Sequence, residues 1–220
     1  MSKVERVCDA LDLRYERKEW TRREKVLDEL ILTILSQNTT ATNCDEAFRC
    51  LSERFVTWDE ARVAPWQKIA EAIRVGGLAD RKAPKIKRIL EEIRDRQPNL
   101  DLEWIAHAPS DEALSYLMAF DGVGRKTAAC VLMFGLGRPV MPVDTHVHRV
   151  ATRLGLIEKA TADKAHDLLQ AIVPPDRVYS CHVNMVTHGR QVCHARNPEC
   201  GKCVLQRECN YYAEQYQTRR

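Results

Sequence analysis

The chain has 220 residues, of which 45% are hydrophobic and 30% charged, and its formal net charge is only +3. This length allows one good core or two small lobes, and affinity for an acidic partner must come from local patches. Residues 1–20 are charged throughout, and no stretch approaches the ~18 apolar residues of a membrane span. We therefore expect a soluble intracellular protein whose cysteines are thiols or metal ligands.

The hydrophobic pattern is helical nearly everywhere. In EKVLDELILTILSQ the apolar residues fall on one helical face, namely Val26, Leu27, Leu30, Ile31, Ile34 and Leu35. Thr21 with Glu24, and Thr57 with Glu60, have the spacing of capping boxes. Further helices are predicted over 42–55, 66–75, 82–96, 111–119, 125–136, 145–155, 162–173 and 178–190. No segment alternates as a strand, so the predicted fold class is all-α.

The segment from Arg74 to Leu90 is strongly basic, with a single acid at Asp80. Its basic residues are Arg74, Arg81, Lys82, Lys85, Lys87 and Arg88. A charge run of this kind is typical of a solvated helix face. It is also compatible with a nucleic-acid contact, and the pattern alone leaves both readings open.

The turn Gly122-Val123-Gly124 separates two apolar helical segments. Two glycines allow positive φ and the close approach of a partner, and the next helix presents free N–H groups to an anion. Arg125 and Lys126 lie in the first turn of that helix, where the helix dipole disfavours cations. The turn is either an ordinary helix connection with two exposed cations or a phosphate-binding hairpin with a reactive lysine.

Asp144 precedes the helical pattern of residues 145–155, which predicts an N-cap. His146 and His148 follow it, and without a third ligand we predict ordinary hydrogen bonds for both. Near the end of the chain, four cysteines follow the spacing C-x6-C-x2-C-x5-C: Cys193, Cys200, Cys203 and Cys209. Four thiolates can hold a zinc ion or a [4Fe–4S] cluster. The presence of only one C-x2-C pair favours the cluster modestly.

In order along the chain, FDGVGRKTA, PVDTHVHRV, HGRQVC and the cysteine spacing resemble the endonuclease III branch of the helix-hairpin-helix DNA glycosylases. The resemblance runs from about Thr21 to Cys209. It implies a [4Fe–4S] cluster on the four cysteines and two helical lobes with a DNA-binding cleft between them. The barrel lobe would cover 21–136, with the hairpin at about 111–136. The cluster lobe would combine 1–20 with 137–220, including the loop 193–209.

The same resemblance implies the chemistry. Lys126 would attack C1′ of a flipped nucleotide, displace a damaged base, and cut the strand by β-elimination through a Schiff base, while Asp144 would assist proton transfer. The substrate would be double-stranded DNA with a damaged base, most simply an oxidised pyrimidine, or an abasic site. We expect a monomer, in the cytoplasm or nucleoid if the source is bacterial.

Leu78 resembles the leucine that wedges into the base stack, although a core leucine at a helix end would fit the pattern too. Either Gln37 or Asn38 would fill the space left by the flipped nucleotide. The remaining DNA contacts implied are Gly122, Val123, Gly124, Arg125, Arg81, Lys82, His146 and Arg196.

Three residues depart from the family pattern: Asp121, Asn197 and Glu199. Asp121 is an acid near the phosphate-binding turn and is expected to weaken DNA binding, whereas Asn197 and Glu199 stand where relatives tend to be basic and leave affinity and lesion preference open. The competing hypotheses are a non-catalytic DNA-binding module, a glycosylase of different lesion or mismatch specificity, and a zinc-bearing interaction domain.

Overall fold

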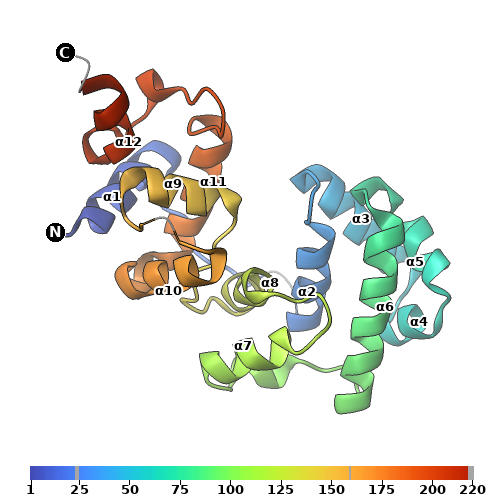
Figure 1. Cartoon of the computed structure of the whole chain (residues 1–220). Helices are drawn as coiled ribbons and strands as arrows, with labels where there is room; N and C mark the ends of the chain where they lie inside the picture. The colour runs from blue at the N-terminus through green and yellow to red at the C-terminus, as the bar shows by residue number, and fades with distance from the viewer. Residues whose placement is uncertain (23–24, 159, 218–220) are drawn as a thin grey trace. The chain divides into compact units, whose positions relative to one another are not determined.

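The computed structural model describes residues 1–22, 25–158 and 160–217 of the chain. Throughout these ranges the regular structure is helical and contains no strand (Figure 1). The predicted all-α class is confirmed. Among the same residues, no helix is both long enough and apolar enough to cross a membrane.

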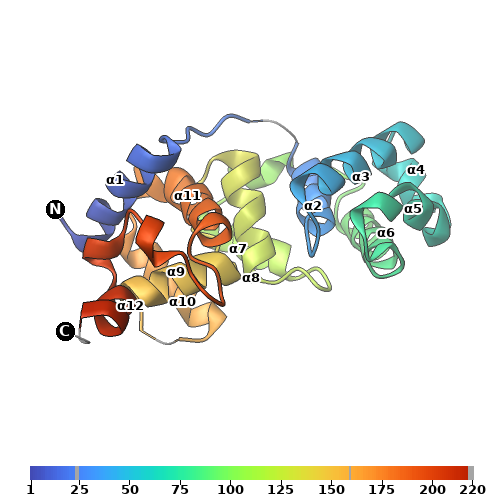
Figure 2. The same cartoon turned by 90° about the horizontal axis from the view of Figure 1, so that it is seen from above.

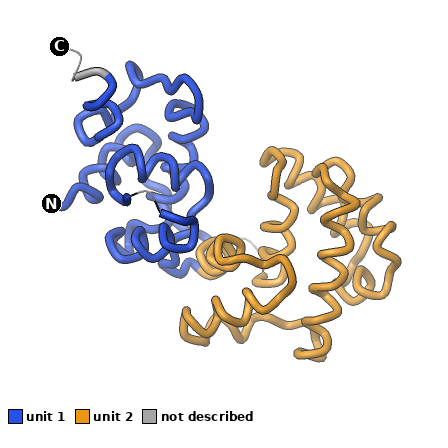
Figure 3. The backbone as a smooth tube through the Cα atoms, viewed as in Figure 1, with its two compact units in different colours: residues 1–21, 137–220 blue, residues 22–136 orange. Residues whose placement is uncertain are grey.

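The chain divides into two compact units, coloured separately in Figure 3. One unit is continuous and covers residues 22–136. The other is discontinuous and combines residues 1–21 with residues 137–220. Each unit has its own core.

The continuous unit is built around a buried central helix, α2 (Val26–Leu35). All six apolar residues predicted to share one face of this helix are buried. It packs against α3 (Ala41–Arg54), α6 (Ala79–Arg96) and α8 (Arg125–Cys130). The other helices of the unit are α4 (Trp58–Val63) and α5 (Trp66–Ala72), which pack on α6, and α7 (Ser110–Met118), which packs on α8. Helix α8 continues as a π-helical turn, η3 (Val131–Gly135), and short 3₁₀ turns are η1 (Arg74–Gly76) and η2 (Glu103–Ala106).

The two predicted capping boxes have different outcomes. Thr57 caps α4, its hydroxyl accepting from the Glu60 N–H at 3.3 Å, but the Glu60 carboxylate accepts from Val56 instead of Thr57. Helix α2 begins one residue after Lys25, which makes no side-chain cap. Glu24 lies outside the described residues, and Thr21 lies too far upstream to be the N-cap of this helix.

The discontinuous unit joins the two ends of the chain. Its helices are α1 (Lys3–Tyr15), α9 (Thr145–Leu154), α10 (Ala162–Ile172), α11 (Val178–Gln191) and α12 (Asn210–Tyr212). Shorter helical turns are η4 (Pro175–Arg177), η5 (Cys200–Lys202), η6 (Gln206–Glu208) and η7 (Ala213–Gln217). Figures 1 and 2 both show α1 and α11 side by side, although they lie at opposite ends of the sequence.

Helix α1 is held against α11 by apolar and polar contacts. Its buried face consists of Val4, Val7, Cys8 and Leu11. Beside this face, the Asp12 carboxylate accepts hydrogen bonds from Ser180 Oγ at 2.6 Å and Asn184 Nδ2 at 2.8 Å. The half-buried Asp12 carboxylate at this interface is thus paired, as buried polar groups usually are.

Candidate functional site

The predicted hairpin forms between α7 and α8. Gly122 has φ of 73°, in the left-handed region that glycine adopts without strain. Val123 is buried, and its N–H donates to Phe120 O at 3.0 Å, which closes the turn. Gly124 is the N-cap of α8, and a Cβ placed on it would meet no atom within 4 Å. The protein's own packing therefore does not require glycine at position 124.

Two basic residues of α6 contact this hairpin. The ammonium of Lys85, on α6, donates to Gly122 O, and a Cβ on Gly122 would lie 2.8 Å from Lys85 Cε. Burial lowers the pKa of Lys85, while nearby Asp121 raises it. One turn along α6, Arg88 forms an ion pair with Asp121. Both cations are therefore engaged in holding the turn.

Lys126 lies in the first turn of α8 and is half-buried. Among the residues that the structure describes, its ammonium has no hydrogen-bond or ion-pair partner. The helix dipole disfavours a cation at this end. This amine is thus placed beside a tight turn, and no described residue of its own unit neutralises it.

Two exposed loop residues of the same unit have strained backbones. Leu78, the N-cap of α6, has φ of 53° and ψ of 32°, and 44% of its surface is exposed. Asn38, in the turn after α2, also has φ of 53°, whereas Gln37 beside it is half-buried. A left-handed conformation costs roughly 1–2 kcal/mol for a residue such as leucine. The alternative interpretation of Leu78 as a core residue is wrong, because a core side chain would be buried and this one is exposed.

Asp144 caps α9 in the discontinuous unit. Its Oδ1 accepts from the Val147 N–H at 2.8 Å, so the predicted N-cap is confirmed. The carboxylate is only half-buried, and one oxygen suffices for the cap. The second oxygen keeps lone pairs for another partner.

The four cysteines of residues 193–209 line one cavity, together with Arg153, Tyr211 and others. Each cysteine is half-buried. Burial raises the pKa of the Cys203 thiol to about 11, which means that a thiolate here requires a neighbouring cation. Over the described ranges, no three His, Cys, Asp or Glu side chains converge where a single metal ion would bind.

Hydrogen-bond donors lie beside two of these sulfur atoms, those of Cys193 and Cys203. Arg153 Nη1 lies 3.2 Å from Cys193 Sγ, and the Leu205 N–H lies 3.4 Å from Cys203 Sγ. His188 Nε2 lies 3.3 Å from the same Cys203 sulfur, while Tyr15 Oη lies 3.0 Å from His188 Nδ1. Donors to sulfur stabilise thiolates and are typical of the surroundings of iron–sulfur clusters. The side chains present thus suit a thiolate-bound metal group.

Comparison with known proteins places this architecture. The HhH-GPD superfamily of base excision DNA repair proteins matches residues 31–175. The chain belongs to this superfamily. Endonuclease III of Thermotoga maritima is 33% identical over 202 residues, which cover 89% of each chain. A solved structure of a trapped endonuclease III–DNA covalent intermediate has a TM-score of 0.81 and 27% identity, covering 97% of this chain and 98% of that one.

A plant relative is longer. An Arabidopsis thaliana protein named as a candidate DNA glycosylase is 39% identical over 180 residues, which cover 81% of this chain and 61% of that protein. The chain therefore spans less than two thirds of the length of this relative.

Within this HhH-GPD chain, the predicted role of Lys82 is wrong. Its side chain is only 4% exposed, and its ammonium donates to Leu35 O at 2.7 Å and Gly76 O at 2.9 Å. It cannot lie on the surface as a phosphate contact. The basic segment is likewise no uniform solvated face, since Lys85, Lys87 and Arg88 also bind the protein. Arg81 is exposed and remains a prediction as a DNA contact.

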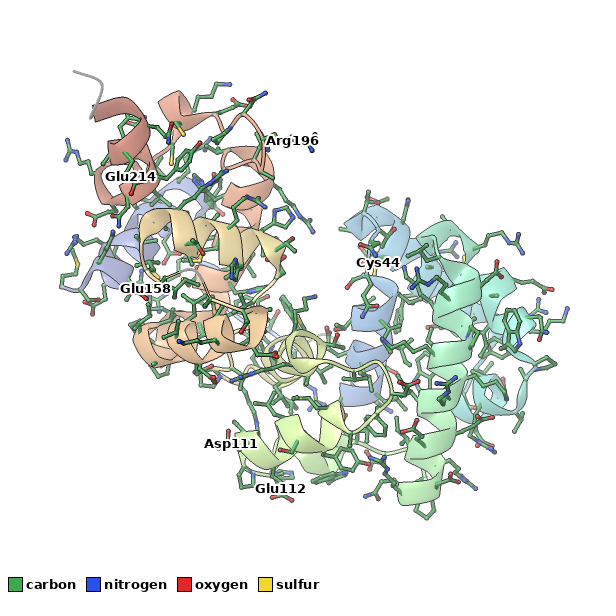
Figure 4. All side chains as sticks on the ribbon, viewed as in Figure 1. Cys44, Asp111, Glu112, Glu158, Arg196 and Glu214 are labelled. Carbon is green, nitrogen blue, oxygen red and sulfur yellow. The ribbon has the colours of Figure 1, made fainter. Side chains whose placement is uncertain are left out.

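The remaining predicted contacts occupy the surface to different degrees. His146 Nδ1 lies 3.1 Å from Arg149 Nη2, and His148 Nε2 lies 2.9 Å from Ala160 O, so both imidazoles make the ordinary hydrogen bonds predicted for them. Arg196 is exposed, and Figure 4 shows its side chain on the loop that follows α11. Glu199 pairs with Lys202 at 2.5 Å. Part of its expected repulsion of DNA is therefore neutralised locally.

Sequence reasoning missed the residues that hold the cysteine loop. Arg149 donates to Cys193 O at 2.9 Å and Gly189 O at 2.9 Å, and Arg153 donates to His194 O at 2.7 Å. The signal was present, because two arginines four positions apart share one face of α9. The Tyr15 and His188 contacts had no comparable signal, since 173 positions separate the two residues.

Proposed function

We propose that this HhH-GPD protein is a bifunctional enzyme, which removes a damaged base from DNA and then cuts the strand at the abasic site. The observation that carries the proposal is the placement of Lys126: a lysine without a partner in the described residues, two positions after a hairpin glycine that packing does not require. The solved relative trapped as a covalent DNA intermediate supports a covalent mechanism. We propose an oxidised pyrimidine as the substrate base.

The hairpin binds the DNA backbone in this proposal. The absence of a Cβ at Gly124 lets a phosphate approach the first turn of α8, where backbone N–H groups lack helical partners. Arg125 adds a positive charge beside them. Lys85 and Arg88 stabilise the turn from α6, so the hairpin keeps its shape without DNA.

Lys126 is the nucleophile. Its neutral amine forms a bond to C1′ of the flipped nucleotide as the C1′–N bond breaks, and the base leaves with the bonding electrons and takes up a proton. Opening of the sugar gives a protonated Schiff base. Removal of a C2′ proton then expels the 3′ phosphate, and water hydrolyses the imine to release Lys126 for another cycle.

Asp144 has a supporting role in the same reaction. Its carboxylate stabilises positive charge on the sugar and accepts or returns a proton during the steps above. The hydrogen bond to Val147 fixes the orientation of the carboxylate without using its second oxygen. Capping and chemistry are therefore compatible in one side chain.

We also propose that Cys193, Cys200, Cys203 and Cys209 hold a [4Fe–4S] cluster. Their shared cavity and the donors beside Cys193 and Cys203 support a thiolate-bound metal group, and the single C-x2-C pair favours this cluster over a zinc ion. When bound, the cluster would cross-link residues 193–209 and provide a redox-active centre. Arg196 is carried on this loop and would meet DNA from it.

Borohydride trapping on a duplex with one thymine glycol or one abasic site tests the lysine. The wild-type protein should give a covalent adduct and a nick, whereas Lys126→Gln should bind abasic duplex but give neither. Lys68→Gln is the matched control, because Lys68 is an exposed lysine of the same unit that pairs with Glu71. Normal trapping by Lys126→Gln would move the nucleophile to another lysine.

A further inference from the structure

Leu78 combines an exposed apolar side chain with a left-handed backbone, and both are unfavourable for a leucine. It is exposed, so burial does not stabilise it, and its left-handed backbone is strained for a leucine. Strained residues persist only where the surrounding structure holds them, and they concentrate at functional sites. Contacts elsewhere in the protein must therefore hold Leu78 in this conformation.

Lys82 binds the loop of Leu78 through its side chain, because its ammonium donates to Gly76 O at 2.9 Å. Its backbone N–H also donates to Leu78 O at 2.9 Å, but this is the first-turn bond of α6, which any residue except proline would make at position 82. Gly76 is itself buried, and a Cβ there would lie 2.9 Å from Ala47 Cβ on α3. The carbonyl that Lys82 binds is thus fixed against the core, and the lysine sets the path of residues 76–78 from it.

The same ammonium holds a second loop. It donates to Leu35 O at 2.7 Å, at the last residue of α2. Three residues later, Asn38 adopts a left-handed conformation identical in φ to that of Leu78. A cation is favoured at this end of a helix, where carbonyls lack helical partners. One buried ammonium therefore binds the starting residues of two exposed loops, each of which contains a residue in the left-handed conformation.

The partners of the Lys82 ammonium are the carbonyl oxygens of Leu35 and Gly76. Cys44, labelled in Figure 4 on α3, is the nearby titratable group. Burial raises its pKa to about 11, so it is a neutral thiol. Its Sγ donates to Leu32 O at 3.6 Å. No carboxylate is paired with the ammonium of Lys82 among the described residues.

We propose that Lys82 is a positioning residue, which fixes residues 36–38 and residues 76–78 as one rigid platform for opening the base stack. The proposal rests on the proposed function and on the predicted roles of two loops, in which Leu78 is the wedge and Gln37 or Asn38 fills the space left by the flipped nucleotide. Lys82 touches no DNA. It fixes the positions of residues 36–38 and residues 76–78 relative to each other, so that the wedge and the space-filling side chain enter the duplex together.

The test compares Lys82→Met with Lys87→Met. Both replacements remove a lysine of α6 that donates to a backbone carbonyl, but Lys87 binds Arg62 O, away from both loops. Base removal from a thymine glycol duplex is measured under single-turnover conditions on folded protein. Lys82→Met should slow it between about tenfold and a hundredfold, the loss expected when a positioned group moves by about 1 Å. Lys87→Met should keep the wild-type rate.

A role in stability alone would not produce the next two results. Lys82→Met should bind undamaged duplex as the wild type does, and a lesion placed in a mismatch should restore much of the lost rate, because less unstacking is needed. Hydrogen exchange should accelerate in residues 36–40 and 75–79 more than elsewhere. If Lys82→Met fails to fold, Lys82→Arg replaces it, since the longer planar head keeps the charge but displaces the carbonyls.

The proposal is overturned if Lys82→Met, or Lys82→Arg in its place, removes the base at the rate of Lys87→Met. It is also overturned if the mismatch gives no rescue. An inactive wild-type protein on every damaged duplex would instead overturn the proposed function, so the two failures are distinct.

Discussion

Replacing Asp144 separates its structural role from its chemical one, because asparagine and alanine differ as helix caps. Asparagine caps about as well as aspartate, whereas alanine costs about 1 kcal/mol. The Val147 N–H bonds one carboxylate oxygen at 2.8 Å, and an amide oxygen can accept the same bond. Asp144→Asn should lose only the charge–dipole contribution, about 0.3–1 kcal/mol. Asp144→Ala should lose this and the cap.

These free energies translate into melting temperatures. For a chain of this size, 1 kcal/mol corresponds to roughly 2–4 °C. Asp144→Asn should therefore melt within ~1–4 °C of the wild type, and Asp144→Ala lower than Asp144→Asn by a further ~2–4 °C. Thr161→Ala is the matched control, since Thr161 caps α10 of the same unit through the Lys164 N–H.

The reaction should respond in a different order. Positioned acid–base groups contribute about 10²–10⁴-fold. Single-turnover release of thymine glycol should fall by roughly this factor in both Asp144 variants, although their stabilities differ, and should be unchanged in Thr161→Ala. If Asp144→Asn excises the base at nearly the wild-type rate, the carboxylate is a cap alone and the chemical role is refuted.

Two further predictions concern the cysteine cavity and the loop at the start of α6. Cys203→Ser should lose the brown colour and bound iron, as read by absorbance and by iron and sulfide analysis, while the buried Cys130→Ser keeps both; zinc without iron in wild-type protein made with ample iron would contradict the cluster. Leu78→Ala should slow base removal yet leave affinity for undamaged duplex unchanged, because a wedge acts on extrusion and not on phosphate binding; a normal rate in the folded fraction would rule out the wedge.

Local chemistry was predictable from the sequence, because it depends on neighbours within a few positions. The face of α2, the cap at Asp144 and the turn at Gly122 each follow from a period or from one residue's conformational freedom. The family motifs then assigned Lys126 and the four cysteines to a reaction and a cofactor.

Partners far along the chain were not predictable. Lys82 has the same charge as its exposed neighbour Arg81 and lies on the same helix. Nothing in the nearby sequence indicates that the Lys82 ammonium binds the carbonyl of Leu35, 47 positions away. A backbone carbonyl leaves no mark in the sequence, because every residue carries one. The same reason hid the contact of Lys85 with Gly122. A basic run therefore reports how many cations a helix has, and not which of them face solvent.

The pairing of α1 with α11 has a consequence for synthesis on the ribosome. Asp9 and its partner Arg177 are separated by 168 positions, so at ~5–20 residues per second the partner is made roughly ten to thirty seconds later. Residues 22–136 can meanwhile complete their own core. Until translation reaches α11, the stripe of Val4, Val7 and Leu11 stays uncovered on the nascent chain. During that interval the stripe is available to a chaperone, and a stalled ribosome would prolong its exposure.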